Sequence, residues 1–373
     1  MDHAKPSLEL VSSLTDEHVL RALMEHRRLT RAELAARIGI SKPTAGESVR
    51  RLAERGLVVD TGERTQGGRG RGRVGSYYAL TENAGTALTV SIAPEGVVAE
   101  CVDAYGDTRA RATRALDRPA RPEDIAAAVR AAVEEVATEP RLAVVSAADP
   151  VDRATGRLIQ LPDAPFLLGE LDPADVLAPY VDGPVVVDND VNWAARAEEA
   201  GDDFAYLFLG EGLGCAIVHD GEVRRGGNGL AGELAHVITV GEDGSATPFI
   251  EVFGQLGLRR PGSTAIDPAR LIGMTVWHRA IGEAVSGVLA AIVALADPAK
   301  VVVGGDWGPA LLPAIGKAFD AHRRRVPLQA ASVTDEPALN GARGDALNRL
   351  RADIVSPGRT GRSERAAPGR PSR

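Results

Sequence analysis

The chain has 373 residues and a net charge of −8; 44% of its residues are hydrophobic and 25% are charged. This balance is typical of globular proteins and excludes a fibrous or largely disordered chain. The length predicts a small domain beside a larger one. We find no uninterrupted apolar stretch of about 20 residues and no signal-sequence pattern at the start, and therefore expect a cytoplasmic protein.

The charge is distributed unevenly along the chain. Residues 1–80 contain 14 Lys and Arg against 10 Asp and Glu, and residues 356–373 contain five Arg against one Glu. An acidic middle between two basic ends favours a phosphate-binding module attached to a body that does not bind phosphate. Cys101 and Cys215, the two cysteines, both lie in apolar runs, which excludes a disulfide framework or a cysteine zinc site.

Three short helices are predicted near the start of the chain. Apolar residues recur at helical spacing over 15–24, and Thr30 with Glu33 forms a capping-box pattern before a second helix that ends at Gly39. Ser41 is the expected cap of a third helix, which ends at Gly56. Strand patterns at 57–59 and 77–80 enclose the arginine–glycine loop 67–73. Together these elements predict a winged helix-turn-helix over residues 12–82.

The third helix and the arginine loop carry the side chains expected to contact DNA. Polar and cationic residues alternate with the apolar stripe of the helix, as a helix in the major groove requires. The arginines of the loop suit phosphate or minor-groove contacts. The alternative is that both are ordinary solvated surface. The candidate DNA-binding residues are Ser41, Lys42, Thr44, Glu47, Ser48, Arg50, Arg51, Arg69, Arg71 and Arg73.

Strands and helices alternate from about residue 86, which predicts an α/β domain over 86–355 and a disordered basic tail over 356–373. Strands are expected at 87–92, 96–103, 141–147, 184–188, 204–210, 213–219 and 300–304. Helices are expected at 122–139, 190–200, 265–297 and 307–323.

The stretches VVVDNDVNWAARAEE, LGEGLGCAIVHDGEVRRGGNGLAGELAHV and VVVGGDW, with the helix-turn-helix before them, resemble the ROK family of repressors, open reading frames and sugar kinases. The resemblance implies a two-lobed, actin-like (ribonuclease-H-like) ATPase fold that holds a sugar between its lobes. It also implies sugar-binding roles for Asn189, Asp190, Glu233, His236 and Glu251, of which Asp190 matches the catalytic base of the kinases.

Three departures from the family pattern argue against catalysis. Pro94 and Glu95 stand in the first phosphate turn, and Glu211 stands in the second, where small residues with free amides normally hold nucleotide. The cysteine zinc loop of the family is absent. We therefore expect no metal and no cofactor, and no enzyme activity.

The sequence favours a regulator that forms a homodimer or a dimer of dimers, most simply a repressor of carbohydrate-related genes. It is expected to bind an operator and to respond to a sugar or sugar phosphate. Two alternatives stay open. The first is a sugar kinase that also binds DNA, and the second is a DNA-binding dimer that responds to no small ligand.

Overall fold

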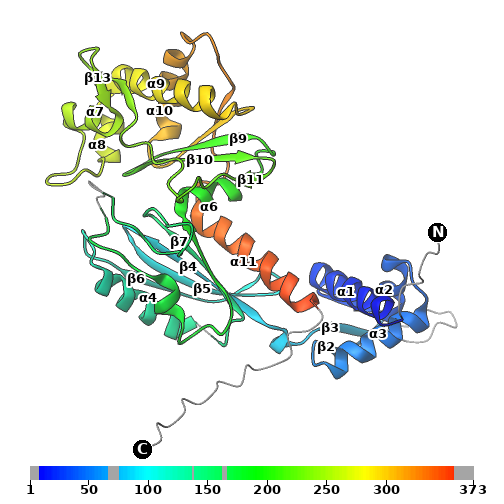
Figure 1. The fold of residues 1–373 in the computed structure, drawn as a ribbon. Helices are drawn as coiled ribbons and strands as arrows, with labels where there is room; N and C mark the ends of the chain where they lie inside the picture. Colours follow the sequence, from blue (N-terminus) through cyan, green and yellow to red (C-terminus); the bar gives the residue numbers. More distant parts are fainter. Residues whose placement is uncertain (1–7, 66–74, 137, 162–165, 357–373) are drawn as a thin grey trace, which may run out of the picture. The chain divides into compact units, whose positions relative to one another are not determined.

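The computed structural model describes residues 8–65, 75–136, 138–161 and 166–356, whose contacts divide the chain into two units (Figure 1). The first unit comprises residues up to Gly85 and residues from Asn348 onward, and the second comprises Thr86–Leu347. The sequence had assigned residues 348–355 to the second domain, whereas here they group with the first unit. The arginine loop 67–73 and nearly all of the basic tail lie outside the described residues.

The first unit is a three-helix bundle with a small sheet. Its helices are α1 (Leu8–His26), α2 (Arg31–Ile38) and α3 (Lys42–Glu54), and its strands are β1 (Arg28–Thr30), β2 (Val58–Arg64) and β3 (Ser76–Leu80) in the order β1-β3-β2. The capping box of Thr30 and Glu33 is present, and Gly39 ends α2 in the left-handed conformation. This arrangement is a winged helix-turn-helix.

The helices of the first unit are held by apolar side chains at helical spacing. Leu20 and Leu23 of α1, Leu34 of α2, and Val49 and Leu52 of α3 are at most 1% exposed. Because these residues recur every three or four positions, one stripe of each helix faces a common core. The first helix begins seven residues earlier than the sequence pattern indicated.

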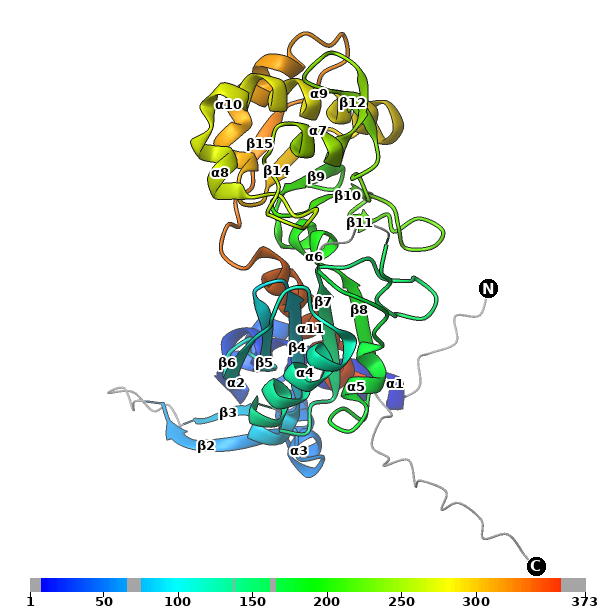
Figure 2. The same cartoon turned by 90° about the vertical axis from the view of Figure 1, so that its left-hand side faces the viewer.

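The second unit begins with a five-stranded sheet in the order β6-β5-β4-β7-β8. A short η1 turn (Glu82–Ala84) precedes its strands, which are β4 (Thr86–Ala93), β5 (Gly96–Asp103), β6 (Thr108–Ala115), β7 (Leu142–Ala147) and β8 (Val185–Asn189). Helix α4 (Pro122–Val136) packs on one face, and α5 (Pro173–Leu177) lies beside β8 (Figure 2). Strand β6 was not expected from the sequence.

A second five-stranded sheet has the order β11-β10-β9-β14-β15. Its strands are β9 (Phe204–Leu209), β10 (Leu213–His219), β11 (Glu222–Val223), β14 (Val301–Gly304) and β15 (Leu328–Ala330), and helix α6 (Asp190–Ala197) precedes them. A two-stranded hairpin of β12 (Ile238–Val240) and β13 (Ala246–Pro248) leads to α7 (Phe249–Gln255). Strands β9 and β14 are parallel, and β10 is antiparallel to β9.

The helix expected over 265–297 is divided into α8 (Pro268–Gly273), the turn η2 (Thr275–Trp277) and α9 (His278–Ala296), because Gly273 and Met274 interrupt the helical backbone. Helix α9 packs against α10 (Gly308–Phe319). Thr275–Ala296 is long and apolar enough by composition to cross a membrane, but half of the tested window is buried inside the protein. Its Val285, Val288 and Leu289 are fully buried in the core, as expected for an internal helix.

The last helix, α11 (Pro337–Val355), contributes to both units. Its first half lies on the face of the β4–β8 sheet opposite α4 (Figure 2). On this face Arg343 of α11 donates hydrogen bonds to Glu100 of β5 at 2.8 and 3.1 Å. The sequence analysis missed this helix, although its buried residues recur every three or four positions, at Leu339, Ala342, Ala346, Leu350 and Ile354.

Candidate nucleic-acid interface and acidic ligand site

The start of α3 presents polar groups to solvent. Ser41 caps the helix by accepting a hydrogen bond from the backbone amide of Thr44 at 3.2 Å, and the two hydroxyls lie 2.7 Å apart. Ser41, Lys42 and Thr44 are exposed. A capped helix start with an exposed cation and hydroxyls can contact both phosphate and base edges.

Ser48 does not share this surface. It is completely buried, and its hydroxyl donates a 2.5 Å hydrogen bond to Asp16 of α1. Arg51 donates to the same carboxylate at 2.6 and 3.2 Å. The expected groove-facing role of Ser48 is corrected by this arrangement, because its side chain joins α3 to α1. Arg51 is also held in this contact and keeps 28% of its side chain exposed.

The remaining charged residues of α3 neutralise one another on the surface. Arg50 donates a 2.5 Å hydrogen bond to Glu47 and also pairs with Glu54. The hydrogen bond from Arg50 lowers the pKa of Glu47. These exposed pairs are readily screened and exchanged, so Arg50 can turn to a phosphate at little cost. Arg69, Arg71 and Arg73 lie outside the described residues.

Three carboxyl groups of the second unit form an acidic group at the ends of β7 and β8. Asp190 is the first residue of α6, Asp149 follows β7, and Glu233 precedes β12. A continuous set of contacts links them. The amide of Asn189 donates to the backbone oxygen of Asp149 at 3.3 Å, and Gly214 forms a β-bridge with Glu233.

Two glycines fix the position of Glu233. A side chain at Gly214 would lie 2.8 Å from Val191, the neighbour of Asp190, so only glycine lets β10 approach α6 this closely. Gly232 has φ +97°, and a Cβ there would lie 1.7 Å from the backbone oxygen of Cys215. Both positions exclude larger residues and hold the acidic group together.

The three carboxyls share an unusual electrostatic environment. Burial, together with the charges of Asp190 and Glu233, raises the pKa of Asp149 to about 7. Burial likewise raises the pKa of Asp190 to about 7, and a hydrogen bond from the Val191 amide opposes this shift. Burial also raises the pKa of Glu233 to about 7. Glu233 itself is exposed to solvent.

The other proposed sugar contacts are placed differently. Asn189 caps α6 by accepting from the Val191 amide at 2.9 Å, so its side chain orients this turn. Glu251 accepts a 2.9 Å hydrogen bond from Arg259. His236 is exposed, and no interaction within the described residues links it to the acidic group. Of the five sugar-binding residues expected from the sequence, Asp190 and Glu233 interact through their charges. Asp149 joins them in the structure, and the sequence analysis did not identify it as a site residue.

A network of ion pairs occupies the two turns that correspond to the phosphate turns of the family. Arg118 donates to the backbone oxygen of Pro94 at 2.8 Å and to Glu211 at 2.6 Å, and it lies 3.3 Å from Glu95. Arg260 also pairs with Glu211. Burial and the charges of Glu95 and Glu211 raise the pKa of nearby Asp306. Carboxylates and their arginine partners therefore stand at both turns.

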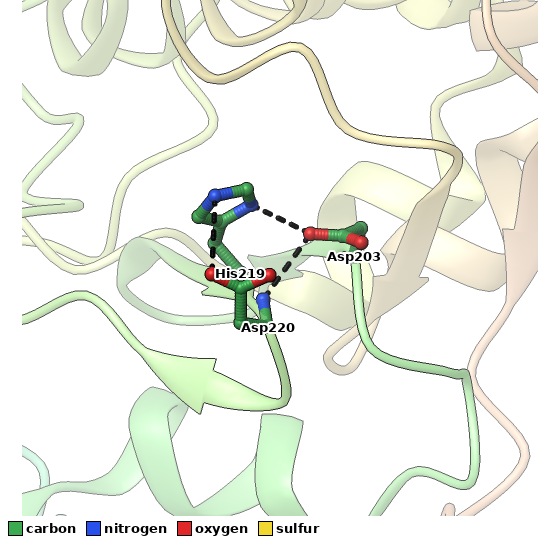
Figure 3. A group of neighbouring side chains, drawn as sticks. All are labelled: Asp203, His219 and Asp220. Atoms are coloured by element: carbon green, nitrogen blue, oxygen red, sulfur yellow. Dashed lines mark hydrogen bonds and ion pairs between the residues drawn. The ribbon is translucent and has the colours of Figure 1, made fainter.

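Asp203, His219 and Asp220 form a separate cluster at the β10–β11 turn (Figure 3). Asp203 lies 2.6 Å from Nδ1 of His219 and accepts from the amide of Asp220 at 3.2 Å. The backbone hydrogen bond from Asp220, followed by the contact with His219, lowers the pKa of Asp203. These contacts stabilise a turn in which Asp220 has φ +52°. The sequence analysis did not identify this cluster.

Comparisons with known proteins agree with this architecture. Residues 13–59 match the family model "Winged helix-turn-helix DNA-binding", and residues 92–248 match the model of the ROK family. A putative xylose repressor from Caldicellulosiruptor sp. is 23% identical over 242 residues, which span 61% of this chain and 59% of the repressor. A glucokinase from Halalkalibacterium halodurans is 43% identical over 68 residues, which span 17% of this chain and 21% of the kinase.

Two solved structures share the fold. A ROK family transcriptional regulator, described as a homologue of the E. coli MLC protein, covers 92% of this chain and is itself covered to 99%, with a TM-score of 0.60 and 16% identity. A ROK family glucokinase from Streptomyces griseus, solved with glucose and AMPPNP, covers 71% of this chain and is covered completely, with a TM-score of 0.55 and 24% identity.

Fold and site together define a protein with a winged helix-turn-helix DNA-binding domain joined to a domain of the actin-like, sugar-kinase-like fold. Residues 92–248 form a ROK family domain.

Proposed function

We propose that this protein is a sugar-responsive transcriptional regulator, in its simplest form a repressor, that binds operator DNA as a homodimer in the cytoplasm. The observation that carries the proposal is the coexistence of a capped recognition helix with a ROK domain whose two phosphate turns hold Glu95 and Glu211. The likeness to a putative xylose repressor supports the same function.

DNA binding would begin at α3. Lys42 and Thr44 are exposed at its capped start, where a recognition helix reaches the major groove. Thr44 would contact a base edge and Lys42 a phosphate, with Arg50 and Glu47 beside them. In a homodimer, two such helices would bind half-sites about 34 Å apart, one turn of DNA. We propose that Arg69, Arg71 and Arg73 add phosphate or minor-groove contacts.

The ligand would bind at the acidic group. Asp190 and Glu233 offer directional acceptors for hydroxyl groups, as sugar recognition requires. Glu95 and Glu211 oppose nucleotide binding, because they already pair with Arg118, the cation that a phosphate at these turns would need. Ligand binding would shift the equilibrium between two arrangements of the chain that differ in DNA affinity.

The test is fluorescence anisotropy with labelled fragments from upstream of the gene. We expect nanomolar, salt-sensitive binding to a specific fragment and a change of at least fivefold when the effector is added, as typical coupling free energies imply. Micromolar binding that is the same for all sequences would contradict the regulator function. Size-exclusion chromatography with light scattering tests the homodimer.

The second candidate function is a sugar kinase. One observation favours it: the pKa of Asp190 near 7 suits a general base that accepts a hydroxyl proton. A coupled assay of ADP release across common hexoses tests this activity. Turnover that Asp190→Asn abolishes would establish the kinase and would contradict our interpretation of the phosphate turns.

A further inference from the structure

Almost all buried carboxylates of the described residues have an arginine partner. Glu100 pairs with Arg111 and Arg343, and Asp188 pairs with Arg225 at 2.6 Å. The buried carboxylates of Asp16 and Asp103 are likewise paired, with Arg51 and Arg109. Burial of an unpaired charge is costly, and this fold avoids that cost repeatedly.

Asp149 is the exception among these buried carboxylates. It is 2% exposed, and its Oδ2 atom has no hydrogen-bond partner within the described residues. The interactions that shift its pKa come from two further carboxylates and from one backbone hydrogen bond of Leu167, and none comes from a cation. A buried acceptor with no internal partner points to a partner from outside the chain.

The spacing of the acidic group distinguishes between two kinds of cation. Within the described residues, the one group of three metal-type ligands whose ligand atoms all lie within 4.8 Å of one another is Asp203, His219 and Asp220. Asp149, Asp190 and Glu233 do not meet this condition, although they interact electrostatically. A compact metal site is therefore not what these three carboxyls form, and a ligand with several polar groups suits them better.

We infer that the ligand of the acidic group is an amino sugar, whose ammonium group binds at Asp149 while its ring hydroxyls bind at Asp190 and Glu233. This inference rests on the proposed function, since it names the ligand class of the same site. An ammonium group supplies the missing cation and up to three hydrogen bonds. A sugar phosphate would bring its negative charge to an acidic group, so we expect it to bind more weakly than the amino sugar.

Isothermal titration calorimetry with the full chain tests the inference. The probes are glucose, galactose and mannose, their amino derivatives at carbon 2, 3 or 6, their N-acetyl derivatives and their 6-phosphates. We expect at least one amino sugar to bind about tenfold or more tighter than its parent hexose, as a charge-assisted hydrogen bond implies. N-acetylation of that amine, which removes its charge, should abolish the preference.

Asp149→Asn removes the buried charge at constant shape and should abolish the preference for the amine. Glu233→Gln changes a hydroxyl contact and should weaken the binding of amino sugar and parent hexose alike. The matched control is Asp220→Asn, which removes a carboxylate outside the acidic group at a left-handed position that asparagine tolerates. It should leave the preference unchanged.

The outcomes separate this inference from the proposed function. A hexose or its phosphate that binds at least as tightly as every amino sugar would overturn the amine assignment and leave sugar sensing intact. The same conclusion follows if Asp149→Asn keeps the preference for the amine. Failure of every probe to bind would reject sugar sensing as well, while operator binding would still decide the regulatory role.

Discussion

Glu100 and Asp149 are both buried carboxylates in the β4–β8 half of the second unit, but their surroundings are opposite. Glu100, 1% exposed, accepts hydrogen bonds from two arginines on β6 and α11. Asp149, 2% exposed, interacts with two more carboxylates instead. The first arrangement stabilises the fold, whereas the second raises the free energy of the protein without ligand. Neutralising Glu100 should therefore destabilise the protein, whereas neutralising Asp149 should stabilise it.

The largest expected effect is that of Glu100→Gln. The substitution leaves Arg111 and Arg343 beside a neutral amide, and breaking a buried ion pair typically costs about 3–5 kcal/mol. Urea unfolding measures the loss. Glu336→Gln is the matched control, because it removes an exposed partner of the same Arg111 and should cost less than about 1 kcal/mol. A cost for Glu100→Gln no larger than that of its control would refute the structural role.

The next effect has the opposite sign. Asp149→Asn should increase the free energy of unfolding at pH 8 by about 2 kcal/mol, since a raised carboxyl pKa penalises the ionised folded state. The folded protein holds a proton on this group between about pH 4 and 7 that the unfolded chain has lost. The stability of the wild type therefore falls as pH rises through this range, and the advantage of the variant should shrink toward pH 5.

Thermal unfolding across pH measures this difference. Asp188→Asn is the control, because Asp188 is equally buried but paired with Arg225, and its neutralisation should destabilise the protein at pH 8. A loss of stability in both variants would show that Asp149 is a structural residue like the others.

Helix α3 likewise contains both a side chain that is bound inside the protein and side chains that are exposed to solvent. Ser48→Ala should cost about 1 kcal/mol of stability, the usual contribution of a hydrogen bond, because the hydroxyl binds Asp16. Operator affinity, measured by anisotropy on the folded variant, should change less than twofold. A large loss of affinity at unchanged stability would restore Ser48 to the DNA interface.

Lys42→Ala should have the smallest effect on stability and a distinct effect on binding. Lys42 is exposed at the start of α3, so its removal should leave the free energy of unfolding unchanged within about 0.5 kcal/mol. Loss of one phosphate contact should weaken specific and nonspecific DNA binding alike and reduce the salt dependence by about one counterion. A selective loss of operator binding would instead assign Lys42 to a base contact.

Local sequence patterns were sufficient to predict the helices and strands whose ends and buried faces depend on neighbouring residues. The capping box at Thr30 and the cap at Ser41 predicted two of the three helices, because caps satisfy backbone amides within a few residues. Most buried strands followed from their apolar runs. Strand β6 was missed because most of its residues are exposed and form no apolar run. The contact of Arg111 and Arg343 with Glu100 joins segments that are distant in sequence.

The sequence by itself determined the winged helix-turn-helix and an α/β body, because caps and apolar periodicity are readable within short windows. The two lobes and the phosphate turns were expected from the resemblance to the ROK family. The tertiary structure alone decided which side chains are available to contact DNA or a ligand. Ser48 turned inward to Asp16, Glu251 paired with Arg259, and Asp149 joined Asp190 and Glu233 without a cation. The reason is physical: burial and charge pairing depend on contacts between distant segments, which no local pattern encodes.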